Sequence, residues 1–242
     1  CAGEVVFWDA AVDKKAGKVK KEFPCPHCNS KLTKRNMERA WTTRLDSTLN
    51  KSIRQAKQVP VLINYNVPGE KRRFEKIPSE NDLELIDKIE NIEIPYWFAD
   101  VKLPDGYNTR QPMKSHGITH VHHFYTKRNL WILSAVLSRL NQVNPRYKAW
   151  YTSTMSWVGR ELRLHLSNYF GGGGGVITSL RGTLYVASLS VETNVLERLG
   201  LRIRWQKFRQ TNLEGTSVQE TCDAAICSVS DNSCDYIFID PP

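Results

Sequence analysis

The chain has 242 residues, of which 40% are hydrophobic, and it contains 7 Trp, 9 Tyr and 8 Phe. A chain of this length and composition can bury one large core or two small ones, which excludes a disordered protein. No stretch is long and apolar enough for a transmembrane helix, and no signal-peptide pattern opens the chain. We therefore expect a cytoplasmic protein with no membrane partner.

The net charge of +9 is distributed unevenly. Residues 1–80 carry 17 basic and 9 acidic side chains, and residues 127–209 carry 13 basic and 3 acidic ones. Residues 81–126 and 210–242 are acidic instead. Basic segments of this kind are typical of proteins that bind a polyphosphate such as double-stranded DNA, although a solvated basic surface has the same composition.

The N-terminal part contains a Cys-Pro-x-Cys motif, Cys25 to Cys28, behind a predicted hairpin of strands at 3–12 and 19–23. Two cysteines at this spacing are typical of a zinc knuckle, in which both thiolates bind one face of a tetrahedral metal. Cys1 lies directly ahead of the first strand, so we expect it to belong to an upstream knuckle whose other cysteine precedes this chain. The sequence therefore predicts a structural zinc site, incomplete here, with Cys1, Cys25 and Cys28 as ligands; unconnected cysteines are the alternative.

Two basic segments follow the cysteines. Residues 33–49 predict a helix that carries Lys34 and Arg35, with Thr33 as a suitable cap. Residues 58–65 and 71–76, on either side of a Pro-Gly turn, predict a hairpin with one basic arm, Lys71-Arg72-Arg73. After it, Ser79 is placed to open a short acidic helix that ends near Pro95.

Four histidines lie between residues 116 and 123. A strand would place His120 and His122 on one face and His123 on the other, so the sequence favours a hydrogen-bonding or phosphate-facing role over a metal site. Thr126 then caps a helix with a leucine stripe and with Lys127 and Arg128 in its first turn.

The glycine run 171–175 has the wrong context for a cofactor loop, because strand-like residues follow it where a helix is needed. We interpret it as a flexible loop. Residues 191–209 predict a helix with Arg198 and Arg202 along one side, which is either a phosphate-contacting face or a solvated one.

The chain ends in an apolar run, Tyr236 to Ile239, followed by Asp240-Pro241-Pro242. The pattern predicts a buried strand that delivers a carboxylate at its carboxyl end, where ligands bind in open α/β sheets. An exocyclic amine on a base is a poor nucleophile, and a carboxylate that accepts its N–H bonds returns electron density to nitrogen. The prolines would keep the loop rigid and nearby carbonyls free. A strand that simply ends in a turn has the same sequence.

Three motifs occur together in one order: Cys25 to Cys28, the segment from Gly117 to Trp131, and Asp240-Pro241-Pro242. In this combination the chain is similar to prokaryotic adenine-specific DNA methylases that contain a zinc ribbon, which share an Asp-Pro-Pro-aromatic motif. The aromatic residue would follow Pro242, and the family's glycine-rich cofactor motif would precede this segment. We therefore expect the chain to be an incomplete part of the enzyme that is inactive alone.

The resemblance implies S-adenosylmethionine as methyl donor and the N6 amine of adenine, in a specific DNA sequence, as acceptor. It implies a catalytic role for Asp240, Pro241 and Pro242, and cofactor contacts from Asp223 with its neighbour Ala224. Phosphate contacts are expected from the basic residues Lys34, Arg35, Lys71, Arg72, Arg73, Lys127, Arg128, Arg198 and Arg202.

The expected fold is an α+β recognition region with an N-terminal zinc-ribbon-like hairpin that leads into the start of an α/β Rossmann-like methyltransferase sheet. Its parts are a zinc-ribbon-like hairpin and basic helix (1–50), an α+β DNA-recognition region (51–210) and a partial catalytic core (211–242). The alternative is a zinc-ribbon module that binds nucleic acid without catalysis.

Overall fold

The computed structural model describes residues 1–70, 72–140, 146–201, 230 and 233. Within them the chain is a mixed α+β fold in which each strand pairs with a single antiparallel neighbour. The helices are α1 (Phe7–Ala11), α2 (Glu80–Glu90), α3 (Tyr107–His116), the 3-10 helix η1 (Val121–Phe124), α4 (Lys127–Leu140), α5 (Arg146–Met155) and α6 (Leu166–Gly171). The paired strands are β1 (Val12–Asp13) with β2 (Lys18–Val19), β3 (Phe23–Pro24) with β4 (Lys31–Leu32), β5 (Trp41–Asp46) with β6 (Lys51–Ala56), β7 (Ile63–Asn66) with β8 (Arg73–Lys76), and β9 (Arg163–Leu164) with β10 (Ile177–Thr178).

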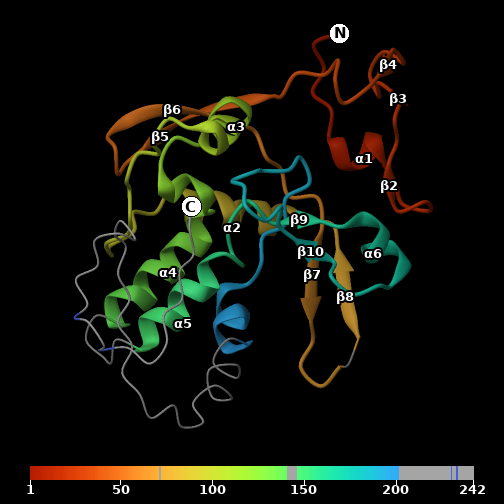
Figure 1. The fold of residues 1–242 in the computed structure, drawn as a ribbon. Helices are drawn as coiled ribbons and strands as arrows, with labels where there is room; N and C mark the ends of the chain where they lie inside the picture. Colours follow the sequence, from red (N-terminus) through yellow and green to blue (C-terminus); the bar gives the residue numbers. More distant parts are fainter. Residues whose placement is uncertain (71, 141–145, 202–229, 231–232, 234–242) are drawn as a thin grey trace.

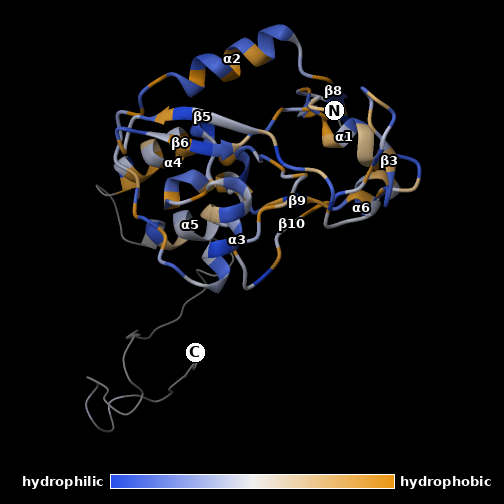
Figure 2. Ribbon diagram, turned by 90° about the horizontal axis from the view of Figure 1, so that it is seen from above, coloured by the Kyte–Doolittle hydropathy of each residue, from blue (hydrophilic) through white to orange (hydrophobic). Residues whose placement is uncertain are grey.

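Helices α4 and α5 lie side by side in the body of the molecule (Figure 1). The long β5–β6 hairpin crosses next to α3, and the N-terminal elements α1 to β4 lie at one end, beside α6. Figure 2 shows α2 along one edge, and α2 contacts α4. In the part of the chain described here, none of the helices has the length and apolar character needed to cross a membrane.

Three clusters of buried apolar side chains hold these elements together. The largest packs the predicted leucine stripe of α4, with Leu133 and Leu140 buried, against Trp150 and Tyr151 of α5. A second cluster is built from Leu103, Ile118, Phe124 and Val186, and a third joins Trp8 of α1 to Leu166 of α6. Each such side chain contributes roughly 2 to 3 kcal/mol relative to exposure, so the clusters provide the main drive for folding.

The prediction of an N-terminal strand over residues 3–12 is wrong for most of this range. Residues 7–11 form α1, which buries Trp8 and Ala11, and the Trp8 ring stacks on Phe170 of α6 with centroids 6.0 Å apart. Only Val12 and Asp13 form a strand, and they pair with β2 across a lysine-rich turn, where Gly17 has φ 60°. The tertiary contact with α6 favours a helical face over the alternation of a strand.

The prediction of a basic helix over residues 33–49 is also wrong, because residues 41–46 form β5 and pair with β6. β-branched Thr42 and Thr43 favour a strand, and Asn50 (φ 50°) takes the left-handed conformation that this turn needs. The Asp46 carboxylate accepts the turn's N–H groups from Thr48 and Leu49. The expected domain boundary at residue 50 falls inside this turn.

Other local predictions are confirmed. The basic-armed hairpin is β7–β8, and Ser79 caps α2 in a reciprocal capping box with Asp82. Thr126 Oγ1 accepts the Asn129 N–H in the first turn of α4. The glycine run lies between α6 and β10, so the helix precedes the glycines and the strand follows them. This order is the reverse of a phosphate-binding loop.

The histidine segment forms η1 and not a strand, so His122 and His123 lie on the same side. Both donate from Nε2 to Oδ2 of Asp46 at 2.8 Å, and all three side chains are buried. Asp46 Oδ1 meanwhile accepts the N–H groups of Thr48 and Leu49 at 3.0 and 3.2 Å. We call this group, Asp46 with His122 and His123, the carboxylate clasp; it joins the β5–β6 hairpin to η1.

Buried His116, at the end of α3, makes folding stability depend on pH. Burial, together with the charges of Arg39 and Arg160, lowers the pKa of His116 to about 4. Because this pKa is depressed on folding, its contribution is present above the unfolded value near 6.5 and is lost as pH falls toward 4.

We expect His116→Gln to reduce the loss of unfolding free energy between pH 7 and pH 5 by about 2 kcal/mol relative to the unchanged chain. Urea denaturation at both pH values measures this difference, with a chelator present throughout so that metal release does not contribute. An equal loss in the variant and the unchanged chain would contradict the prediction.

Candidate functional site

The three N-terminal cysteines expected to bind zinc converge in space. Cys1, Cys25 and Cys28 place their sulfur atoms within 4.8 Å of one another. Sγ of Cys1 lies 3.7 Å from Sγ of Cys25, although 24 residues separate them in sequence. Four sulfurs around a tetrahedral zinc, at about 2.3 Å each, lie about 3.8 Å apart, so the observed spacing fits a zinc ion.

The turn from Cys25 to Ser30 has the backbone of a knuckle. The Cys25 N–H donates to Ser30 O at 2.8 Å, and the Asn29 N–H donates to Cys25 O at 2.9 Å. Asn29 has φ 58°, which asparagine tolerates better than most residues and which turns the chain back after Cys28. The β3–β4 pair closes directly around this turn.

The thiol chemistry of Cys28 suits metal binding at neutral pH. Hydrogen bonds from the Ser30 side chain and backbone, and then from Cys25, lower the pKa of Cys28 to about 7. A thiolate is the form that binds zinc. The His27 ring is directed elsewhere, with Nε2 2.8 Å from the Glu4 carbonyl oxygen. Cys1, Cys25 and Cys28 would hold the ion, which would crosslink the N-terminus to the knuckle, and the fourth position would come from another ligand.

The carboxylate clasp is a second group whose ligand atoms are close enough to hold a metal ion. Its hydrogen bonds favour a different role. His123 Nδ1 accepts the Thr119 N–H at 3.2 Å, so Nε2 carries the proton that is donated to Asp46. A metal on Nε2 would move this proton to Nδ1, where it would face the Thr119 N–H donor. The clasp is therefore better explained as a buried hydrogen-bonded joint.

The charge state of the clasp agrees with this role. Burial alone raises the pKa of Asp46, but the bonds from His122 and His123 outweigh it and bring the pKa to about 2. Burial lowers the pKa of His123 to about 4 against the effect of Asp46. At neutral pH the Asp46 carboxylate is thus ionised and His123 is neutral. Both oxygens of the buried carboxylate then accept hydrogen bonds from N–H donors.

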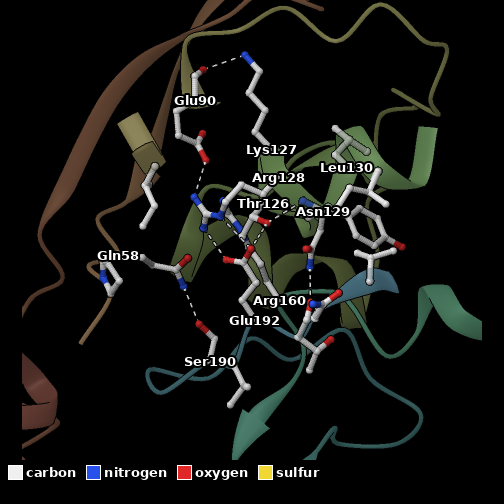
Figure 3. Close-up of a pocket in the computed structure, with 18 of the residues that line it drawn as sticks. Gln58, Glu90, Thr126, Lys127, Arg128, Asn129, Leu130, Arg160, Ser190 and Glu192 are labelled. Carbon is white, nitrogen blue, oxygen red and sulfur yellow. Dashed lines mark hydrogen bonds and ion pairs between the residues drawn. The ribbon is translucent and has the colours of Figure 1, made fainter. Parts of the chain in front are cut away.

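A cleft of about 1890 Å³ lies between the β5–β6 hairpin, α2, the first turn of α4 and residues 189–198 (Figure 3). Gln58 and Ser190 hydrogen-bond across it at 3.1 Å. The predicted phosphate-binding residues Arg73, Lys127, Arg128 and Arg198 all line this cleft, although their segments are far apart in sequence. The fold thus gathers part of the predicted set on one concave surface.

Lys127 and Arg128 are already engaged in the cleft wall. Lys127 Nζ donates to the Glu90 carbonyl oxygen at 2.8 Å. Arg128 forms a two-pronged pair with Glu192, with nitrogen–oxygen distances of 2.9 and 2.5 Å, and lies 3.5 Å from Glu90. Glu90 also pairs with Arg44 at 3.0 Å. Asn129, buried beneath, donates to the carbonyl oxygens of Val158 and Thr193 and so fixes both neighbouring loops.

The remaining predicted residues divide into two groups. Lys34, Arg35 and Arg72 are exposed and do not line the cleft, with the Arg72 guanidinium 4.5 Å from the Phe74 ring centroid. The others lie outside the described residues, and these are Lys71, Arg202, Asp223, Ala224, Asp240, Pro241 and Pro242.

The structure also adds residues that sequence reasoning missed. Asp46 was not singled out because it lies 76 residues before His122, and nothing in the local pattern links the two. Arg44 and Arg160 reach the same wall of the cleft from separate segments. An isolated arginine carries no spacing signal, so only the tertiary fold identifies these two.

A comparison with models of known protein families gave no match, and neither curated proteins nor solved structures similar to this chain were found.

We expect the purified chain to bind one zinc ion and Cys25→Ser to lose most of it, because the variant leaves two thiolates at the site. Metal analysis by mass spectrometry after dialysis measures the content. Cys227→Ser controls for the general loss of a cysteine, and His122→Gln tests the clasp; both should keep the zinc of the unchanged chain. Zinc loss in His122→Gln alone would reverse the assignment.

Proposed function

We propose that this chain is part of an S-adenosylmethionine-dependent methyltransferase that methylates the N6 amine of adenine in DNA. The observation that carries the proposal is the convergence of Cys1 with Cys25 and Cys28, because a zinc-ribbon-like site is one of the three motifs on which the resemblance rests. The exposed basic residues and the basic part of the cleft add support for a polyanionic partner.

The proposed chemistry assigns the Asp240 carboxylate to the target amine. S-adenosylmethionine, when bound, would supply the methyl group: attack by the amine nitrogen would break the carbon–sulfur bond and leave a neutral thioether, and the nitrogen would then lose its proton to solvent. Asp240 accepts an N–H bond and so raises the electron density on nitrogen as its charge develops. In this proposal Pro241 and Pro242 would keep the loop rigid, and Asp223 with Ala224 would contact the donor.

A zinc-ribbon module that binds nucleic acid without catalysis is the second candidate. It is favoured by the fact that the cysteine cluster and the exposed basic residues need no catalytic strand. The two candidates share DNA binding and differ in the role of Asp240.

We expect the chain to bind duplex DNA with an affinity that falls steeply as salt rises, since phosphate contacts release counterions. In the double variant Lys34→Ala/Arg35→Ala, the slope of log affinity against log salt should become shallower by the amount that about two phosphate contacts contribute. Arg110→Ala is the control, because Arg110 is exposed and paired with Asp105 at 2.7 Å. Fluorescence anisotropy over a salt series measures the slopes, and a salt-independent affinity would contradict phosphate binding.

In the enzyme that contains this sequence, we expect Asp240→Ala to abolish methyl transfer and to leave DNA affinity nearly unchanged. The carboxylate acts mainly in the transition state, where one preorganised polar group contributes on the order of 3 kcal/mol, whereas the basic surface supplies ground-state binding. Transfer of labelled methyl groups to adenine measures activity, with Asp235→Ala, at the other end of the predicted strand, as the control. Full turnover by Asp240→Ala would favour the non-catalytic module.

A further inference from the structure

Among the residues that the structure describes, the wall of the cleft contains buried guanidinium N–H groups that form no hydrogen bond. These are Nε of Arg160, Nε of Arg198 and Nη1 of Arg128, the last of which has only an ion-pair contact with Glu90 at 3.5 Å. Buried donors in folded proteins are almost always hydrogen-bonded, so a group of them on one surface calls for an acceptor that binds from outside. The residues come from α4, the turn after α5 and the segment after β10, so the fold has brought them together.

Arg160 and Arg198 are less compensated than Arg128, which is paired with Glu90 and Glu192. Among the residues described here, no carboxylate oxygen lies within 4.0 Å of the side-chain nitrogens of Arg160 or Arg198. The nearby Glu90 is paired with Arg44 and Arg128, and Glu192 is paired with Arg128. Arg44 and Arg128 therefore occupy both glutamates, and Arg160 is left without a carboxylate partner among the described residues.

This arrangement costs stability in the unliganded protein. Burial, with the adjacent charge of Arg44, lowers the pKa of Arg160 to about 10, so the guanidinium is poorly solvated and still charged at neutral pH. An uncompensated half-buried charge is destabilising unless a ligand neutralises it. The surrounding pairs and the Asn129 bonds to both loops hold the other groups in place, so the site needs little reorganisation on binding.

The chemistry of the wall identifies the class of ligand. A guanidinium presents parallel N–H donors that match the oxygens of a phosphate or carboxylate. The first turn of α4, Lys127 to Leu130, also lines the cleft, and the positive end of the helix dipole favours an anion there. The Glu192 carboxylate, which accepts from Thr126 Oγ1 at 3.0 Å, already lies at this end of α4. Acidic residues of α2, including Asp82 and Asp87, line another part of the cleft and would repel a polyanion from it.

We propose that Arg160, with Arg128 beside it and the N-terminal turn of α4, forms a binding site for a single phosphate group in this cleft. The identity of that phosphate as part of a DNA strand rests on the proposed function. The site itself rests only on the unpaired donors and the charge of the wall.

The test compares Arg160→Gln with Arg39→Gln. Arg39 is also a half-buried arginine whose pKa is lowered by burial, but it does not line the cleft. We expect Arg160→Gln to melt at the same temperature as the unchanged chain or higher without phosphate, because the substitution removes an uncompensated charge. A merely structural role for Arg160 would lower the melting temperature instead.

Inorganic phosphate, titrated against sodium chloride of equal ionic strength, should raise the melting temperature of the unchanged chain and of Arg39→Gln. In Arg160→Gln the apparent phosphate affinity should fall by about tenfold or more, while the general stabilisation by phosphate remains in all three proteins. An identical response of the three proteins would overturn the site.

A second arm identifies the source of the phosphate. If DNA binds in the cleft, inorganic phosphate should compete with duplex DNA and Arg160→Gln should weaken DNA binding, whereas Arg39→Gln should not. If phosphate stabilises the protein through Arg160 but DNA affinity is unchanged in Arg160→Gln, the anion site stands and its assignment to DNA is overturned. The failure of the site and the failure of the proposed function are thus separate results.

Discussion

The carboxylate clasp places a single charged group where two parts of the fold meet. Asp46 ends β5, its Oδ1 closes the hairpin turn and its Oδ2 accepts both histidine donors of η1. Because η1 leads directly into α4, the clasp sets the position of the first turn of α4 relative to the β5–β6 hairpin. Those two elements form walls of the cleft, so its shape depends on this buried carboxylate and its four N–H donors.

Among the described residues, the cleft combines ion-paired side chains with the unpaired arginines Arg160 and Arg198. Arg44, Arg128, Glu90 and Glu192 are held by mutual ion pairs, and each of these pairs is partly exposed. Such pairs contribute little to stability by themselves, but they fix the geometry of the groups around Arg160. A binding surface that is held by ion pairs and also contains unpaired guanidinium groups favours an anionic ligand over water. If the proposed phosphate site is correct, the charge of Arg160 costs stability in the unliganded protein.

The cysteine cluster stabilises a different part of the molecule. The N-terminal elements β1 to β4 are pairs of two-residue strands, and such short pairs are marginal without additional support. Phe23 and Cys25 are buried there, and α1 attaches the unit to α6 through Trp8. A zinc ion on Cys1, Cys25 and Cys28 would provide the crosslink that the small core lacks.

The sequence by itself determined the features that rest on local chemistry. The Cys-Pro-x-Cys spacing indicated that Cys25 and Cys28 lie together, and the position of Cys1 ahead of a hairpin indicated the third sulfur, as the structure has it. The Ser79 cap, the Thr126 cap, the leucine stripe of α4 and the β7–β8 hairpin were predictable because each depends on neighbours within a few residues.

Only the tertiary structure decided the features that depend on distant partners. Residues 7–11 are helical because Trp8 packs on α6, and residues 41–46 are extended because they pair with β6 and end in the Asp46 clasp. His122 and His123 face the same carboxylate because η1 tightens the chain where alternation predicted opposite faces. The cleft likewise gathers Arg44, Arg128, Arg160 and Arg198 from four segments. Propensity and spacing describe a residue's neighbours in the chain, whereas the burial of a charge depends on which segments fold against it.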